Sequence, residues 1–166
     1  MFIAHLPAGY ITTSIFIDKF VPREKVNLKL VWFFGLFASI TPDLDLVYFY
    51  LFDSSVHHHK LFPHIPAFWL VFFVCFFLLA RLRRSTTLYC IGLVSSINLL
   101  VHLILDTFVG YVWWLYPLVD KPFYLVEVPA VQSHWILNFL FHWTITLEIV
   151  ILFIAGYLFR KNGLTN

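Results

Sequence analysis

The chain has 166 residues, of which 61% are hydrophobic, 20% aromatic and 12% charged, with a formal net charge of +2. This balance excludes an ordinary soluble domain, in which about a quarter of the residues are charged. The small positive charge does not indicate nucleic-acid binding, because the basic residues lie beside apolar segments and not on one polar face. Length and composition together predict a single integral membrane domain over residues 1–166.

Several apolar segments are long enough to cross a bilayer, which takes roughly 20 predominantly apolar residues in a helix. We expect about five crossings, over residues 2–17, 30–52, 65–80, 86–108 and 135–159. The predicted fold class is therefore all-α, a polytopic bundle of membrane helices. The first segment has neither a basic residue before its apolar run nor a small-residue cleavage site, so we expect it to stay in the mature chain. Cys75 and Cys90 fall inside apolar segments, and we expect both to be reduced.

The basic residues predict the orientation of this bundle. Nine of the eleven lysines and arginines fall in the first and third connections or in the tail, and therefore on one side of the membrane: Lys19, Arg23, Lys25, Lys29, Arg81, Arg83, Arg84, Arg160 and Lys161. Positively charged loops stay in the cytoplasm, so we expect the N-terminus outside and the C-terminus inside. The stretch VHHHKLFPH, residues 56–64, and the long connection 109–134 then lie on the outer face.

Histidines and aspartates gather toward that outer face. His5 lies near the start of the first segment, and Asp43 and Asp45 follow Pro42 in the second. Because proline removes a backbone donor, we expect the helix to be kinked or unwound at Asp43, so that both carboxylates reach a cavity. The alternative is that Asp43 caps a helix and Asp45 lies on the surface.

The stretch VHHHKLFPH contains four histidines, and short histidine-rich tracts often bind divalent metals. For His57 and His58 an adventitious surface cluster is the simpler interpretation. His59 and His64 are five residues apart, and His64 opens the third segment, where its ring can point back into the bundle.

The stretch HLILD, residues 102–106, places His102 and Asp106 four positions apart and hence on one face of a helix. An ionised aspartate inside a bilayer is costly unless it is paired, and a divalent cation would offset that cost. The alternative is a neutral histidine that hydrogen-bonds to the aspartate and joins two helices.

Taken in order and spacing, these motifs resemble the YdjM-like family of LexA-binding, inner-membrane-associated metal-dependent hydrolases. The likeness extends from about His5 to Phe123, through PDLD at 42–45, HKLFPH at 59–64 and HLILD at 102–106. The family's HRGxTH is altered, since Lys60-Leu61 and Pro63 replace its Arg-Gly and Thr. Both imidazoles are kept, but the tight glycine turn and the hydroxyl are lost. The resemblance implies a hydrolase in a bacterial inner membrane. LexA binding is implied by the family name alone, because the residues show no docking signature.

The order of ligands is also similar, more weakly, to that of the zinc-dependent phospholipase C and P1 nuclease group. Those enzymes continue with a further histidine and an HxxxE pair. Here His134 and His142 come later, and Glu148 follows His142 by six residues, off the expected face. We therefore expect one or two ions, and we expect Glu148 to be a structural residue, protonated or hydrogen-bonded, deep in the last segment.

The residues predicted to bind metal are His5, Asp43, His59, His64, His102 and Asp106, with Asp45 as the candidate that orients a ligand or takes a proton from water. Mixed imidazole and carboxylate ligands suit Zn²⁺ first and Mn²⁺ second. A site at the outer bilayer surface favours a lipid or lipid-linked phosphoester as substrate, hydrolysed by metal-activated water. The expected partners are membrane lipids and no nucleic acid.

Two other functions fit the same residues. One is a noncatalytic membrane protein with a structural metal or a polar cluster. The other is a divalent-metal transporter, which needs a polar path to both faces, whereas the cytoplasmic halves of these segments are nearly all apolar. Lys60 would neutralise a phosphate or extend to the membrane interface. An interfacial aromatic belt is expected from Trp113, Trp114, Tyr116, Phe123 and Tyr124.

Overall fold

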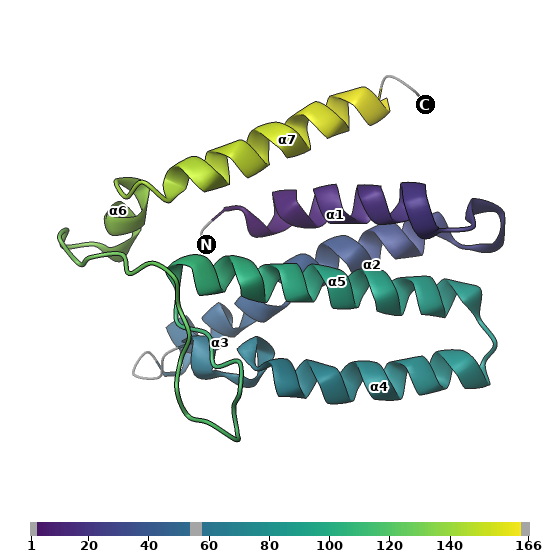
Figure 1. Ribbon diagram of the computed structural model, residues 1–166, viewed down its shortest axis with the longest axis horizontal. Coiled ribbons are helices and arrows are strands. Elements are labelled where there is room, and N and C mark those ends of the chain that lie inside the picture. The colour runs from purple at the N-terminus through teal and green to yellow at the C-terminus, as the bar shows by residue number, and fades with distance from the viewer. Residues whose placement is uncertain (1–2, 54–57, 164–166) are drawn as a thin grey trace.

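The fold is all-α, as predicted. The structure, a computed structural model, describes residues 3–53 and 58–163 (Figure 1). The helices are α1 (His5–Phe20), α2 (Leu28–Ile40), α3 (Asp45–Leu51), α4 (Pro66–Leu82), α5 (Thr86–Val109), α6 (Trp135–Leu140) and α7 (Ile145–Gly163). Four short 3₁₀ turns are η1 (Arg23–Lys25), η2 (Pro42–Leu44), η3 (His58–Lys60) and η4 (Phe62–His64). Across these described ranges, the β-structure consists of one isolated bridge between Val112 and Phe123.

The long helix α5 is the centre of the bundle. It packs against α1, α2 and α4, while α7 packs on α1 (Figure 1). Its 24 residues give a length of about 36 Å at about 1.5 Å per residue. The end at which α1 begins is also the end at which α5 finishes and α4 begins (Figure 1). Residues from these three places can therefore share one site.

Small residues let α1, α2 and α5 approach closely. A Cβ placed on Gly9 would lie 2.4 Å from the Cβ of Ser39, and one on Gly35 would lie 2.5 Å from Thr13 Oγ1. Asn98 of α5 completes this contact, because its Nδ2 donates to Thr13 Oγ1 at 2.9 Å. Small residues and interhelical hydrogen bonds are the usual means of packing helices inside a membrane.

The second predicted segment is broken where the sequence indicates. Helix α2 ends at Ile40, Pro42 starts the turn η2, and the two parts of the segment are bent by 57°. Pro42 supplies no backbone N–H and cannot continue the hydrogen-bond ladder of α2. Because of the break, Asp43 and Asp45 do not lie on one continuous helix. They lie instead at the end of the bundle where α5 finishes.

The expectation of five crossings is met only in part. Within the described residues, helix 86–109 alone is long and apolar enough to cross a membrane, and the bent pair formed by 28–40 and 42–51 passes as a second candidate. Helix α4 is apolar but has 17 residues. The last predicted segment is interrupted between α6 and α7, and α7 contains Glu148, Arg160 and Lys161. Helices α1, α4 and α5 thus coincide with the predicted segments to within three residues, whereas the second and fifth predicted segments are each broken into two helices.

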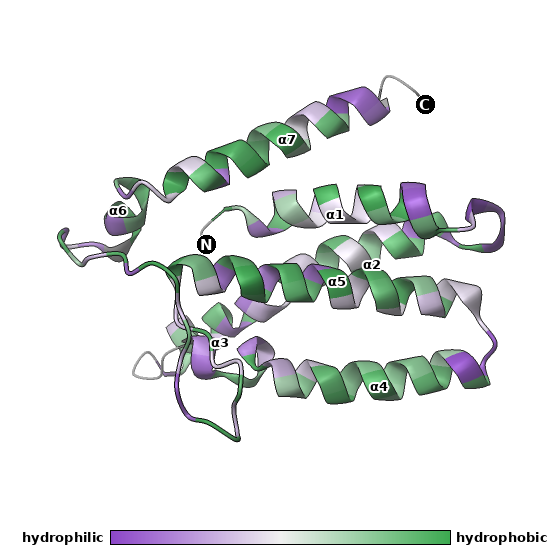
Figure 2. Ribbon diagram, in the orientation of Figure 1, coloured by the Kyte–Doolittle hydropathy of each residue, from purple (hydrophilic) through white to green (hydrophobic). Residues whose placement is uncertain are grey.

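The outer surfaces of the bundle are strongly apolar. Hydrophobic residues run along α4 and α7, and hydrophilic ones gather at the helix ends where α4 and α7 finish (Figure 2). On α4, Leu70 is 68% exposed and Val71 is 65% exposed. Monomeric soluble proteins rarely expose continuous apolar surface of this kind.

Candidate metal centre

Six of the predicted site residues meet at one end of the bundle. His5 is the first residue of α1, Asp43 lies in η2, His59 in η3, His64 ends η4, and His102 and Asp106 occupy the last two turns of α5. The chain brings them together because the break after α2 and the two 3₁₀ turns fold over the end of α5. They come from segments that are far apart in the sequence.

The carboxylate of Asp106 is surrounded by four imidazoles. Its Oδ1 lies 3.0 Å from His5 Nε2, and its Oδ2 lies 3.0 Å from His102 Nε2. The same Oδ2 is 3.4 Å from His64 Nε2 and 3.8 Å from His59 Nε2. All four histidines therefore present the same nitrogen to one buried carboxylate.

The second carboxylate, Asp43, lies on the open side of this cluster. Its Oδ1 is 3.7 Å from His102 Nε2 and 3.9 Å from His64 Nε2. The side chain of Asp43 is 30% exposed, whereas His102 and Asp106 are each 1% exposed. Access to the cluster is therefore from the side of Asp43.

The ligand atoms form two groups that could each hold an ion. One group is His5, Asp43, His102 and Asp106, and the other is His59, His64 and Asp106; within each, the candidate atoms lie within 4.8 Å of one another. Asp106 belongs to both, so its two oxygens can bridge two ions. The two groups provide two possible ion sites, in agreement with the expected one or two ions.

Hydrogen bonds at the opposite nitrogen orient three of the rings. The Nδ1–H of His102 donates to the carbonyl of Ser39 at 2.7 Å, and that of His59 donates to the carbonyl of Tyr111 at 3.2 Å. Such bonds fix the tautomer and leave the Nε2 lone pair available to a metal. These two carbonyls were not predicted from the sequence, because every residue has a backbone carbonyl and the residue type does not indicate which one accepts a hydrogen bond.

Asp45 orients the third ring. The Nδ1–H of His64 donates to Asp45 Oδ2 at 2.6 Å, and Asp45 is buried. A carboxylate behind a histidine is a frequent partner of metal-binding imidazoles. Of the two roles expected for Asp45, the structure places it where it can orient a ligand. It is buried, so the alternative of a surface Asp45 is wrong.

The electrostatics of the cluster favour a cation. Burial alone would lower the pKa of His64, but its hydrogen bonds with Asp106 and Asp45 outweigh burial and raise the pKa to about 9. The rings of His5 and His102 are stacked at 3.8 Å, so two imidazolium ions there would repel each other. His102 Nε2 has no hydrogen-bond partner among the described residues, although Asp106 Oδ2 is close. A divalent ion would satisfy these buried groups, and the donor set fits one.

Gly110 is a site residue that the sequence analysis missed. A Cβ at this position would lie 2.7 Å from His59 Cε1 and 3.1 Å from its Nδ1. The glycine therefore lets the His59 ring approach the end of α5. Its place just after the HLILD helix is the only sequence signal that could have indicated this role.

His134 and His142 lie outside this cluster. His57 is outside the described residues. His134 is exposed and accepts a hydrogen bond from the backbone of Ile136, and His142 Nδ1 lies 2.9 Å from Thr144 Oγ1. Neither belongs to a metal-binding group within the described part of the chain.

Glu148 is a hydrogen-bonded structural residue, as expected, but its depth was predicted wrongly. It is buried in the first turn of α7 and accepts a hydrogen bond from the backbone of Ile3, two residues before His5. The break between α6 and α7 keeps the start of α7 at the end of the bundle that holds the cluster (Figure 1). Glu148 therefore anchors the start of the chain near the site.

The connection after α5 is tied to η3, which carries His59. Lys60 Nζ lies 2.9 Å from Asp120 Oδ2, and Trp113 Nε1 donates to Asp120 Oδ1 at 2.9 Å. The hydrogen bond from Lys60 holds the pKa of Asp120 below its usual value. Lys60 is thus ion-paired within the chain. Trp114 of the expected belt donates to Thr107 Oγ1, which fastens the same connection to α5.

Comparison with known proteins agrees with the motifs and their arrangement. Neither the curated proteins nor the solved structures contain a match to the chain. A family model described as YdjM inner membrane protein matches residues 1–163, nearly the whole length. The chain therefore belongs to the YdjM inner membrane protein family.

Proposed function

We propose that this protein is a membrane-bound, metal-dependent hydrolase that cleaves a phosphoester of a lipid or lipid-linked substrate. The observation that carries the proposal is the position of Asp106, which is shared by two groups of converging histidine and aspartate atoms. Paired ions held in this way are a common device for phosphoester hydrolysis. Imidazole and carboxylate ligands favour Zn²⁺, with Mn²⁺ as the next choice.

Six side chains would hold the ions: His5, Asp43, His59, His64, His102 and Asp106. When bound, ions of this kind activate water as a nucleophile and neutralise charge on a phosphoryl group. In the reaction, the water oxygen bonds to phosphorus and the ester P–O bond breaks. Its electron pair stays on the leaving oxygen, which takes up a proton, so that one water yields an alcohol and a phosphate.

Other groups would act by position, as would Asp43 besides its role as a ligand. Asp45 holds the His64 ring through Nδ1, and the carbonyl of Ser39 holds His102 in the same way. Asp43 lies at the exposed edge, where a phosphoryl group would approach. The buried surroundings of Asp106 keep bulk water from the inner side of the cluster.

The charge pattern supports a site that faces away from the cytoplasm in the inner membrane. Nine basic residues lie in or directly beside the α1–α2 and α4–α5 connections or at the end of α7, whereas the metal-binding groups lie where α1 begins and α5 finishes (Figure 1). Basic segments favour the cytoplasmic side. We therefore propose the N-out, C-in arrangement, with five membrane-inserted segments and lipids as partners. A reporter fused after Arg160 should be active only in the cytoplasm, and activity outside would reverse this orientation.

Hydrolysis is tested with the purified full chain in detergent, loaded with Zn²⁺ or Mn²⁺ and mixed with phospholipids of several head groups. We expect release of phosphate or a phosphorylated head group, and loss of that release in His102→Ala. His134→Ala is the matched control, since His134 lies outside both metal-binding groups. Bound metal without turnover, and a loss of stability when it is removed, would instead indicate a noncatalytic protein with a structural ion. Metal uptake into proteoliposomes would indicate a transporter.

A further inference from the structure

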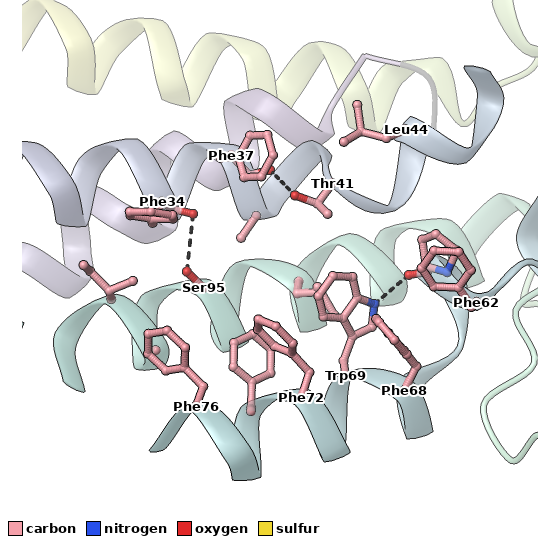
Figure 3. A pocket seen from close by; sticks show the side chains of 16 residues that line it. Phe34, Phe37, Thr41, Leu44, Phe62, Phe68, Trp69, Phe72, Phe76 and Ser95 are labelled. Atoms are coloured by element: carbon pink, nitrogen blue, oxygen red, sulfur yellow. Dashed lines mark hydrogen bonds between the residues drawn. The ribbon is translucent and has the colours of Figure 1, made fainter. Parts of the chain in front are cut away.

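A deep apolar groove runs along the bundle between α2 and α4. Its volume is about 380 Å³, and its floor is formed by α5. Phe34 and Phe37 of α2 face Trp69, Phe72 and Phe76 of α4 across it (Figure 3). The volume lies within the range of small-molecule sites, about 300–1,000 Å³.

The lining of this groove has almost no groups that could form a hydrogen bond with a polar ligand. Among the described residues that line it, Thr41 and Ser95 alone carry a side-chain hydroxyl. Thr41 Oγ1 donates to the carbonyl of Phe37 at 2.7 Å, and Ser95 Oγ donates to that of Phe34 at 3.4 Å. No charged side chain lines the groove in the described part of the chain. Its chemistry therefore fits a hydrocarbon chain.

One end of the groove adjoins the candidate metal centre. Leu44 follows Asp43 directly, and Pro63 precedes His64 directly; both line the groove, and the carbonyl of Pro63 accepts a hydrogen bond from Trp69 Nε1 at 2.6 Å. Asp43 is the exposed member of the cluster. A molecule in the groove therefore has its outer end beside the open edge of the metal-binding groups.

The other end lies deeper along α5. Gly92, which lines that end, precedes Asp106 by 14 residues, or about 21 Å at about 1.5 Å per residue. A Cβ on Gly92 would lie 2.7 Å from Phe77 and 3.0 Å from Phe76, so these rings close tightly over the glycine. The groove follows the helix axes, as lipid chains do in a bilayer, and the outer face of α4 beside it is apolar.

We propose that this groove holds one alkyl or acyl chain of the substrate, which slides in from the membrane between α2 and α4. The phosphoester then reaches the metal centre beside Asp43, a step that rests on the proposed function. The substrate class is accordingly a phosphoester lipid that presents a single chain to the groove. The bundle selects it by chain as well as by head group.

Occupancy is tested by photolabelling the full chain with dodecyl phosphate that bears a diazirine at the far end of its chain. We expect adducts in the deep part of the groove, at Phe72, Phe76 and Ile91. Adducts spread over Val71, Val74 and Leu78, which are exposed but outside the groove, would overturn the proposal. So would adducts concentrated at Leu100 and Leu115, in the separate hollow between α4, α5 and residues 114–118.

Selection by chain is tested with two substrates that release the same product, dodecyl p-nitrophenyl phosphate and methyl p-nitrophenyl phosphate. The ratio of kcat/KM for the two should fall toward one in Ser95→Phe, and also in Ala38→Phe, which fills the groove from α2. Leu93→Phe is the matched control on α5, because Leu93 is exposed and does not line the groove. An unchanged ratio in both groove variants would refute the proposal.

Failure of the proposed function would look different. If neither substrate is cleaved while deep adducts form and also form in Asp106→Asn, the groove holds a lipid chain but the metal centre is not a hydrolase. If both substrates are cleaved equally well and deep adducts are missing, the hydrolase remains and the groove has no part in it.

Discussion

His102 and Asp106 lie one turn apart on α5, and their Nε2 and Oδ2 atoms are 3.0 Å apart without hydrogen-bond geometry. The Nδ1–H of His102 is instead engaged by the carbonyl of Ser39. The pair therefore points toward a shared position, as two ligands of one ion do. Around this pair, six other imidazole nitrogen to carboxylate oxygen distances, to Asp43, Asp45 and Asp106, are 3.9 Å or less and define the cluster.

Replacing Asp45 tests the orientation of His64. Asp45→Asn keeps the size of the side chain but removes the charge that faces His64 Nδ1. Loss of such a partner usually lowers metal affinity about 10- to 100-fold. Isothermal titration with Zn²⁺ would measure the change. Asp18→Asn removes an exposed carboxylate near the opposite end of α1 and should leave the affinity unaltered; wild-type affinity in Asp45→Asn would show that His64 needs no such support.

Gly110→Ala should disturb one metal-binding group more than the other. The added Cβ meets the His59 ring at 2.7 Å, whereas His5 and His102 belong to the other group. We expect reduced metal content, with loss from the group of His59 and His64. Gly156→Ala is a control in open space, because a Cβ there meets nothing within 4 Å. Full metal content in both variants would mean that His59 tolerates displacement.

Close packing of α1 on α2 should be sensitive to a single methyl group. Gly9→Ala places a Cβ 2.4 Å from that of Ser39, so α1 must move, together with His5 at its start. Overpacking of this kind costs about 1–3 kcal/mol. Thermal or denaturant unfolding in detergent should reveal the loss, while Gly156→Ala unfolds like the wild type. Wild-type stability of Gly9→Ala would show that the helices have room to separate.

The effect of metal on stability should depend on pH. The pKa of His64 is about 9 in the folded, metal-free protein and 6.5 when unperturbed. A raised folded pKa gives stability that is fully present below pH 6.5 and is lost as pH rises through about 9. Metal binding requires the neutral ring and releases its proton. The increase in Tm on adding Zn²⁺ should therefore grow from pH 6.5 to pH 9. An increase that shrinks over this range would contradict the assignment of His64 as a ligand.

The sequence predicted local features of this protein better than distant ones. The four-residue spacing of His102 and Asp106 defines a common helix face, and Pro42 breaks the helix where expected, because both effects act within one or two turns. The pairing of Asp45 with His64 spans 19 residues of irregular chain, so its geometry depends on how η2 and η4 pack. The depth of Glu148 was predicted wrongly because an apolar run conceals the break before α7.

The break inside the last apolar segment, and the number of helices long enough to span a membrane, are the other features that composition could not supply. Apolar residues fill the predicted segments, but the interruption at 141–144 and the short α4 reduce the clear membrane spans to one or two. Hydropathy averages over such breaks, because apolar residues such as Phe141 and Trp143 also occupy the interruption. The close approach of the His59 ring to Gly110 could not be predicted either, because the ring comes from η3 and the spacing of residues along α5 does not indicate it.

The most direct test of the metal centre is the metal content of gently purified protein, measured by mass spectrometry in the wild type, His59→Ala and Asp106→Asn. With Asp106 shared by both groups, we predict two divalent ions per chain in the wild type, one in His59→Ala and none in Asp106→Asn. Circular dichroism confirms that each variant is folded. Wild-type protein that binds no Zn²⁺ or Mn²⁺ even after reconstitution would contradict the account, and the cluster would then be a hydrogen-bonded helix contact.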